Sequence, residues 1–122
     1  MITPFPKEKD FRISTHLHHR EFRCKCKQKD CTQTLVDIAL VEAFEHFRAA
    51  TGEPLYITSG FRCQWWNSFS DGSPKSTHKL GMAMDLIVPK GISYKDFALK
   101  ADSFFNRVLA NYESENFIHV NM

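Results

Sequence analysis

The chain has 122 residues, and hydrophobic side chains make up 43% of it, a composition that excludes an intrinsically disordered chain and gives room for one domain. No stretch approaches the roughly 20 consecutive apolar residues of a spanning helix, which excludes membrane insertion. The formal net charge of +2 is too small to indicate a nucleic-acid partner. We therefore predict a single folded domain over residues 1–122 that binds no nucleic acid.

The first 20 residues are polar, and residues 1–15 are predicted to form an irregular N-terminal segment. They lack the apolar core of a signal peptide, so we expect the protein to be made in the cytoplasm without an export signal. The run His16-Leu17-His18-His19 is interpreted as a solvated surface segment, because it holds no carboxylate or cysteine at ligand spacing.

The cysteines are unevenly spaced, since Cys24, Cys26 and Cys31 lie close together and Cys63 stands alone. This spacing differs from the paired C-x2-C pattern of a zinc ribbon. Without an export signal, reduced and partly buried thiols are the simplest interpretation. Two alternatives stay open, namely a structural zinc site that uses all four cysteines and a disulfide that includes Cys63.

A helix is predicted over residues 34–50, where apolar residues recur at helical spacing. Gly52 is placed to end this helix, and Pro54 prevents its continuation. The β-forming residues 55–58 follow as a short strand.

The second half of the chain alternates between strands and other elements. Residues 64–77 are predicted to form a long loop, and residues 82–88 a second strand that Pro89 and Gly91 end. A second helix opens at Ser93 and carries an apolar stripe from Tyr94 to Val108, and residues 117–121 form a final strand. This order predicts an α+β domain with a small antiparallel sheet and two main helices.

Two histidines and an aspartate form the most informative pattern of the sequence. His78 and Asp85 are separated by a glycine turn, and Asp85 lies in an apolar strand, where an unpaired buried charge would be too costly. His119 lies in the final strand and shares a face with Phe117 and Asn121, whereas the residues between them face the core. Two imidazoles, one carboxylate and an open position for water describe a catalytic zinc site.

These residues also carry a family resemblance. The pattern S-x-H-x-x-G-x-A-x-D over residues 76–85, followed by F-I-H-V over residues 117–120, resembles the zinc D-alanyl-D-alanine carboxypeptidase family. That family includes phage L-alanyl-D-glutamate endopeptidases and shares its fold with the Hedgehog signalling domain. The segment Ile57–Cys63 and Asn67 resemble the S-G-[YF]-R segment of the family and the asparagine that follows it, and the resemblance extends over residues 16–121.

The resemblance implies a role for each matching residue. It implies that His78, Asp85 and His119 bind Zn²⁺ and that Arg62 holds a carboxylate or carbonyl oxygen of the substrate, which a guanidinium can do bidentately. A salt bridge to a nearby carboxylate is the alternative role of Arg62. It implies that Ser76 supports the site by hydrogen bonding; a cap on the loop is the alternative role of this serine.

The chain departs from the family where a general base is expected. Many members have an acid three positions before the last histidine or a histidine two before it, and this chain has Asn116 and Phe117 there. We expect Glu115 to be the base, because it would share the face of His119 if the last strand extended back to it; Glu113 is the next candidate. Asn121 stands where this branch usually has an aspartate.

We therefore expect a monomeric zinc peptidase that cleaves a peptide bond in the stem peptide of peptidoglycan. A phage lysis protein or a virion-borne enzyme acting on the cell wall would explain the missing export signal, by analogy with the family. Two alternatives stay open, namely a D-alanyl-D-alanine carboxypeptidase and a non-catalytic zinc module that binds wall or protein.

Overall fold

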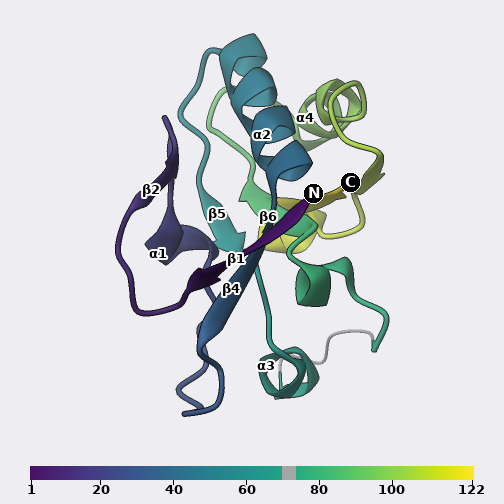
Figure 1. The fold of residues 1–122 in the computed structure, drawn as a ribbon. Helices are drawn as coiled ribbons and strands as arrows, with labels where there is room; N and C mark the ends of the chain where they lie inside the picture. Colours follow the sequence, from purple (N-terminus) through teal and green to yellow (C-terminus); the bar gives the residue numbers. More distant parts are fainter. Residues whose placement is uncertain (70–73) are drawn as a thin grey trace.

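The computed structural model describes residues 1–69 and 74–122. Its centre is a four-stranded antiparallel sheet with the strand order β5-β6-β8-β7 (Figure 1). The strands are β5 (Ile57–Ser59), β6 (Ala83–Ile87), β7 (Arg107–Leu109) and β8 (Phe117–Asn121). The predicted α+β class is confirmed, and β6 and β8 pair so that Asp85 lies directly opposite His119.

The sequence predicted an irregular N-terminal segment, but in the structure this segment forms paired strands. β1 (Ile2–Pro6) pairs antiparallel with β4 (Gln33–Asp37), and β2 (Arg12–Ser14) pairs with β3 (Leu17–His18). The two prolines of β1 are tolerated because this strand lies at an edge and has one neighbour. The β1–β4 pairing joins residues about 30 positions apart, which local sequence patterns do not reveal.

The histidine run is also only partly solvated. His19 begins the short helix α1 (His19–Phe22), and its side chain is fully buried, with Nδ1 at the carbonyl oxygen of Lys9 and Nε2 2.8 Å from Thr34 Oγ1. The prediction of a solvated residue was therefore wrong for His19, because backbone and hydroxyl groups satisfy its ring nitrogens.

The first long helix starts later than the apolar spacing indicates. Residues up to Asp37 belong to β4, and α2 (Ile38–Thr51) begins after Asp37, whose carboxylate accepts a hydrogen bond from the backbone N–H of Ala39 at 3.1 Å. Gly52 ends the helix as predicted, with a left-handed φ of 69°. Pairing with β1 overrides the helical pattern of residues 34–37.

The predicted loop over residues 64–77 contains a helix, α3 (Gln64–Phe69), and the start of a 3₁₀ turn, η1 (Thr77–Leu80). At the start of α3, the backbone N–H of Asn67 donates to the carbonyl oxygen of Cys63 at 2.9 Å. Its aromatic side chains stack on one another, which stabilises a helix that lacks an apolar stripe. The part of the predicted loop at residues 70–73 lies outside the described residues.

The second long helix ends earlier than predicted. α4 (Tyr94–Ala101) opens at Ser93 as expected, and Ser93 Oγ accepts from the backbone N–H of Asp96 at 3.1 Å. Residues 107–109 leave the helix to form β7, in which Val108 pairs with Val120. Pairing with the open edge of β8 stabilises this apolar segment more than continuing the helix would.

The core lies between the sheet and the two long helices. α2 and α4 lie side by side (Figure 1), and the rings of Phe47 and Phe97 pack with centroids 5.1 Å apart. Both side chains are fully buried, as are Met84, Leu86 and Ile118 on the strands beneath them.

No helix among the described residues is long and apolar enough to cross a membrane.

Candidate metal centre

The sheet and one tight turn bring the predicted ligands together. Asp85 on β6 and His119 on β8 face one another in register, and η1 carries His78 just before β6. Gly81 closes this turn with a φ of 71°, and a Cβ there would lie 2.0 Å from the carbonyl oxygen of Leu35. Only glycine fits this close approach, which seats the turn against β4.

His78, Asp85 and His119 meet through their polar atoms. The ligand atoms of the three side chains all lie within 4.8 Å of one another. Asp85 Oδ1 is 3.1 Å from His78 Nε2 and 3.2 Å from His119 Nδ1. His78 and Asp85 are buried at 2% and 5% exposure, so the group is shielded from water on most sides.

The outer nitrogen of each histidine is held by an oxygen. His78 Nδ1 lies 2.7 Å from the carbonyl oxygen of Gly60, and His119 Nε2 lies 2.9 Å from Asn121 Oδ1. Each outer nitrogen therefore carries a proton that it donates, and the inner nitrogens face Asp85. With their protons on the outer nitrogens, the inner nitrogens and Asp85 would face one another as acceptors only. Either each inner nitrogen is also protonated or a single cation lies between the three groups, so the donor set fits a metal ion.

Asp85 is anionic at neutral pH. Burial by itself would raise the pKa of this carboxyl group, but the hydrogen bonds with His119 and His78 and the charges of the two rings outweigh burial and lower the pKa to about 2. A carboxylate that stays ionised is the form that binds a metal.

Arg62 adjoins the second oxygen of Asp85. Its Nη2 lies 3.4 Å from Asp85 Oδ2, while Nε donates to Ser59 Oγ at 3.1 Å and Nη1 donates to Asn67 Oδ1 at 3.4 Å. The guanidinium thus lies beside the candidate metal ligand Asp85 and links β5, α3 and β6. This contact matches the alternative role of Arg62, a salt bridge to a nearby carboxylate.

Ser76 caps the turn that carries His78. Its Oγ accepts from the backbone N–H of His78 at 3.2 Å, which matches the alternative role that the sequence left open for this serine. The cap fixes the direction in which His78 leaves the backbone.

The last strand does not extend back to Glu115. β8 begins at Phe117, and Asn116 precedes it with a left-handed φ of 60°. Glu115 belongs to the turn η2 (Glu113–Glu115), where its carboxylate is exposed and accepts a hydrogen bond from Ser114 Oγ at 2.7 Å. The shared face with His119 that the strand pattern suggested is therefore absent, because Asn116 turns the chain before the strand begins.

Two contributors to the site were not predicted from the sequence. The Gly60 carbonyl that holds His78 is a backbone group, so no residue type signals it. Asn121 shares the face of His119, and this parity could have identified the amide as the acceptor for the His119 ring. An amide oxygen takes the orienting place that a carboxylate would otherwise fill.

Comparison with known proteins agrees with this geometry. The family model described as Peptidase M15 matches residues 15–121, so the chain belongs to the Peptidase M15 family. Membership supports a zinc-dependent metallopeptidase that acts on peptidoglycan. A search of curated proteins found no match.

Proposed function

We propose that the protein hydrolyses a peptide bond in the stem peptide of peptidoglycan, with zinc held by His78, Asp85 and His119. The observation that carries this proposal is the convergence of these three side chains within 4.8 Å, in a chain that belongs to the Peptidase M15 family. Zinc bound by two imidazoles and one carboxylate polarises a carbonyl group and lowers the pKa of bound water.

Arg62 is proposed to orient the substrate. A guanidinium has five N–H donors, and the three hydrogen bonds to Ser59, Asn67 and Asp85 use one on each nitrogen. One N–H on each terminal nitrogen is then left for a carboxylate or carbonyl oxygen of the substrate. Ser76 is proposed to contact the substrate as well, through the O–H that its cap to His78 does not use.

Glu115 is proposed as the general base, because it is the nearest acid before His119 in the chain. Glu115→Gln should lower turnover by about 10²-fold or more while zinc content is unchanged, with Glu113→Gln as the matched control from the same turn. Unchanged turnover in Glu115→Gln would exclude the role, and a loss confined to Glu113→Gln would transfer it.

One observation favours a second candidate, a non-catalytic zinc module. Asn116 and Phe117 offer no proton acceptor at the positions where many members have a base, and Glu115 is exposed in a turn. Such a module would retain the metal site and bind wall or protein, but it would not hydrolyse peptides.

Mass spectrometry of purified peptidoglycan, digested with the zinc-loaded protein, distinguishes the candidates. An endopeptidase releases fragments cut within the stem, a carboxypeptidase releases free D-alanine, and a binding module releases neither. His78→Ala should abolish release, whereas His46→Ala, which alters an exposed histidine on α2, should not. Release that persists in His78→Ala would contradict the proposed zinc site.

A further inference from the structure

The four cysteines, scattered in the sequence, come together in the structure. Cys24, Cys26 and Cys31 lie between α1 and β4, and Cys63 lies just before α3. The two segments meet because the backbone N–H of Phe61 donates to the carbonyl oxygen of Phe22 at 2.7 Å. A Cβ on Gly60 would lie 2.6 Å from Phe22, so only glycine permits this approach.

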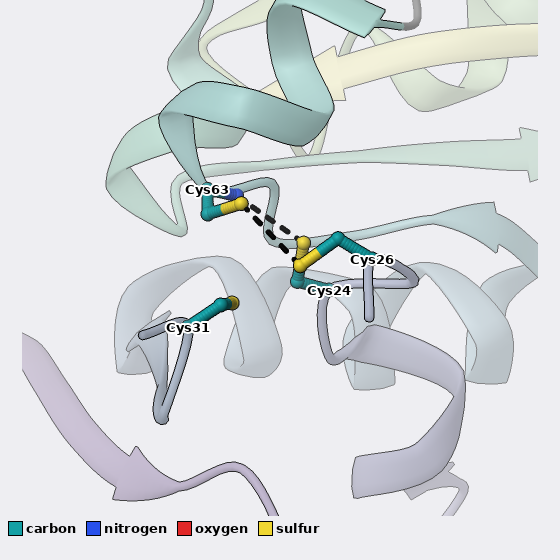
Figure 2. A group of neighbouring side chains, drawn as sticks. All are labelled: Cys24, Cys26, Cys31 and Cys63. Atoms are coloured by element: carbon teal, nitrogen blue, oxygen red, sulfur yellow. Dashed lines mark hydrogen bonds between the residues drawn. The ribbon is translucent and has the colours of Figure 1, made fainter. Parts of the chain in front are cut away.

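Their sulfur atoms surround one point. All four Sγ atoms lie within 4.8 Å of one another, and Cys63 Sγ is 3.5 Å from Cys26 Sγ. Figure 2 shows Cys31 reaching from its own loop toward the other three side chains. Four sulfurs at the Zn–S distance of about 2.3 Å around a tetrahedral ion lie about 3.8 Å apart, close to this spacing. The space between the sulfurs matches the size of a single ion.

Each sulfur also receives a hydrogen bond from outside the cluster of thiols. The backbone N–H of Cys63 donates to Cys24 Sγ at 3.3 Å, and that of Trp66 donates to Cys63 Sγ at 3.4 Å. Lys7 Nζ lies 3.4 Å from both Cys26 Sγ and Cys31 Sγ and donates to the Cys26 carbonyl oxygen at 2.9 Å. Donors directed at sulfur stabilise thiolates, which are the form that binds metals.

The charge around the cluster is matched to an anionic metal site. Zinc with four thiolates carries a charge of about −2, since four negative thiolates outweigh the two positive charges of Zn²⁺. Cys26 and Cys31 line a hollow of about 570 Å³ whose other walls carry six basic side chains and one acid, Glu8. The basic residues are Lys7, Arg20, Arg23, Lys25, Lys27 and Lys29.

We propose that Cys24, Cys26, Cys31 and Cys63 bind a second zinc ion with a structural role, separate from the site of His78, Asp85 and His119. A single disulfide would use two of the four sulfurs, whereas one zinc ion uses all four. The ion would fasten the segment after α1 to Cys63, which directly follows Arg62. It would thereby hold Arg62 in place without contacting substrate.

Zinc content and the atoms that bind zinc test this proposal, whether or not the protein proves to be a peptidase. The unmodified protein and His46→Ala should hold about two zinc ions per chain, and His78→Ala and Cys31→Ser about one each. Cys31 is chosen because it is only half-buried, unlike Cys24 and Cys26.

X-ray absorption at the zinc edge keeps the test independent of how the cysteine variant folds. The zinc that His78→Ala retains should be bound by sulfur alone, at about 2.3 Å. A mercurial thiol reagent should release that zinc completely. The proposal is overturned if His78→Ala holds no zinc or zinc bound by nitrogen and oxygen, if iron replaces zinc, or if peptide mapping finds a disulfide among the four cysteines.

Discussion

His119 is oriented by a neutral amide. Asn121 Oδ1 holds the outer nitrogen of the ring at 2.9 Å, and this contact sets which nitrogen faces Asp85. For His78 the Gly60 carbonyl plays the same part, and as a backbone group it cannot be removed by substitution. Asn121 is therefore the residue through which the orientation of a histidine can be tested without changing a ligand.

Asn121→Ala should weaken zinc binding at this site about 10- to 100-fold, because the His119 ring loses the acceptor that fixes its proton. Asn121→Asp restores an acceptor and should keep the affinity. Competition with a chelator measures the change in zinc affinity. The zinc ion that is missing from His78→Ala is the one bound at this site, so its affinity is the one to compare. Equal affinity in Asn121→Ala and the unmodified protein would show that the contact does not orient the ligand.

Arg62→Lys should retain zinc and lower kcat/KM. The loss of transition-state stabilisation calculated from kcat/KM should be about 1.5–3 kcal/mol, the contribution of a hydrogen bond to a charged group. A lysine keeps the charge but cannot reproduce the planar donors. Arg107→Lys on β7 is the matched control, since this side chain is exposed. Zinc loss in Arg62→Lys would instead make Arg62 a positioning residue for Asp85, and unchanged turnover with zinc retained would refute both roles.

At the level of elements, the sequence could predict those whose patterns are local. The strands around Ile57, Asp85 and His119, and the openings of α4 and the 3₁₀ turn at Ser93 and Ser76, follow from alternation and capping residues. Partners distant in the chain determine three other strands. β1 and β4 exist because they pair with each other, and β7 exists because β8 offers an edge.

A small polar contact fastens the β2–β3 hairpin to α2. Glu45 on α2 accepts from Ser14 Oγ at 2.5 Å, from the backbone N–H of His16 at 2.8 Å, and lies 2.7 Å from His16 Nδ1. Burial raises the pKa of Glu45, but the hydrogen bonds with Ser14 and His16 outweigh it, so the pKa lies below its ordinary value of 4.5.

Because the folded-state pKa is depressed, Glu45 stabilises the fold fully above its unfolded pKa and loses this effect as the pH falls through the folded value. Glu45→Gln should lower the free energy of unfolding by about 1–3 kcal/mol at neutral pH, and the difference should shrink below about pH 4.5. Urea unfolding at several pH values measures it, with the exposed Glu42→Gln on the same helix as control. A difference independent of pH would contradict this linkage.

At the scale of the whole molecule, the two candidate metal sites were not equally predictable. His78, Asp85 and His119 lie on elements whose faces can be inferred from the sequence, so their meeting could be expected. The cysteine cluster depends on the approach of Gly60 to Phe22, which joins segments that no sequence spacing connects. Glu115 does not lie on an extension of the last strand, because Asn116 adopts a left-handed conformation that a strand pattern does not reveal.

The release of new amino groups from purified peptidoglycan, compared between the unmodified protein and Asp85→Asn, tests the central claim most directly. Asp85→Asn keeps the shape of the side chain but removes the charge proposed to bind zinc, and Asp102→Asn alters an exposed aspartate as the control. The unmodified protein and Asp102→Asn should release amino groups in the presence of zinc, and folded Asp85→Asn should release none. Equal release by Asp85→Asn, or no release by the zinc-loaded unmodified protein, would contradict a zinc peptidase at this site.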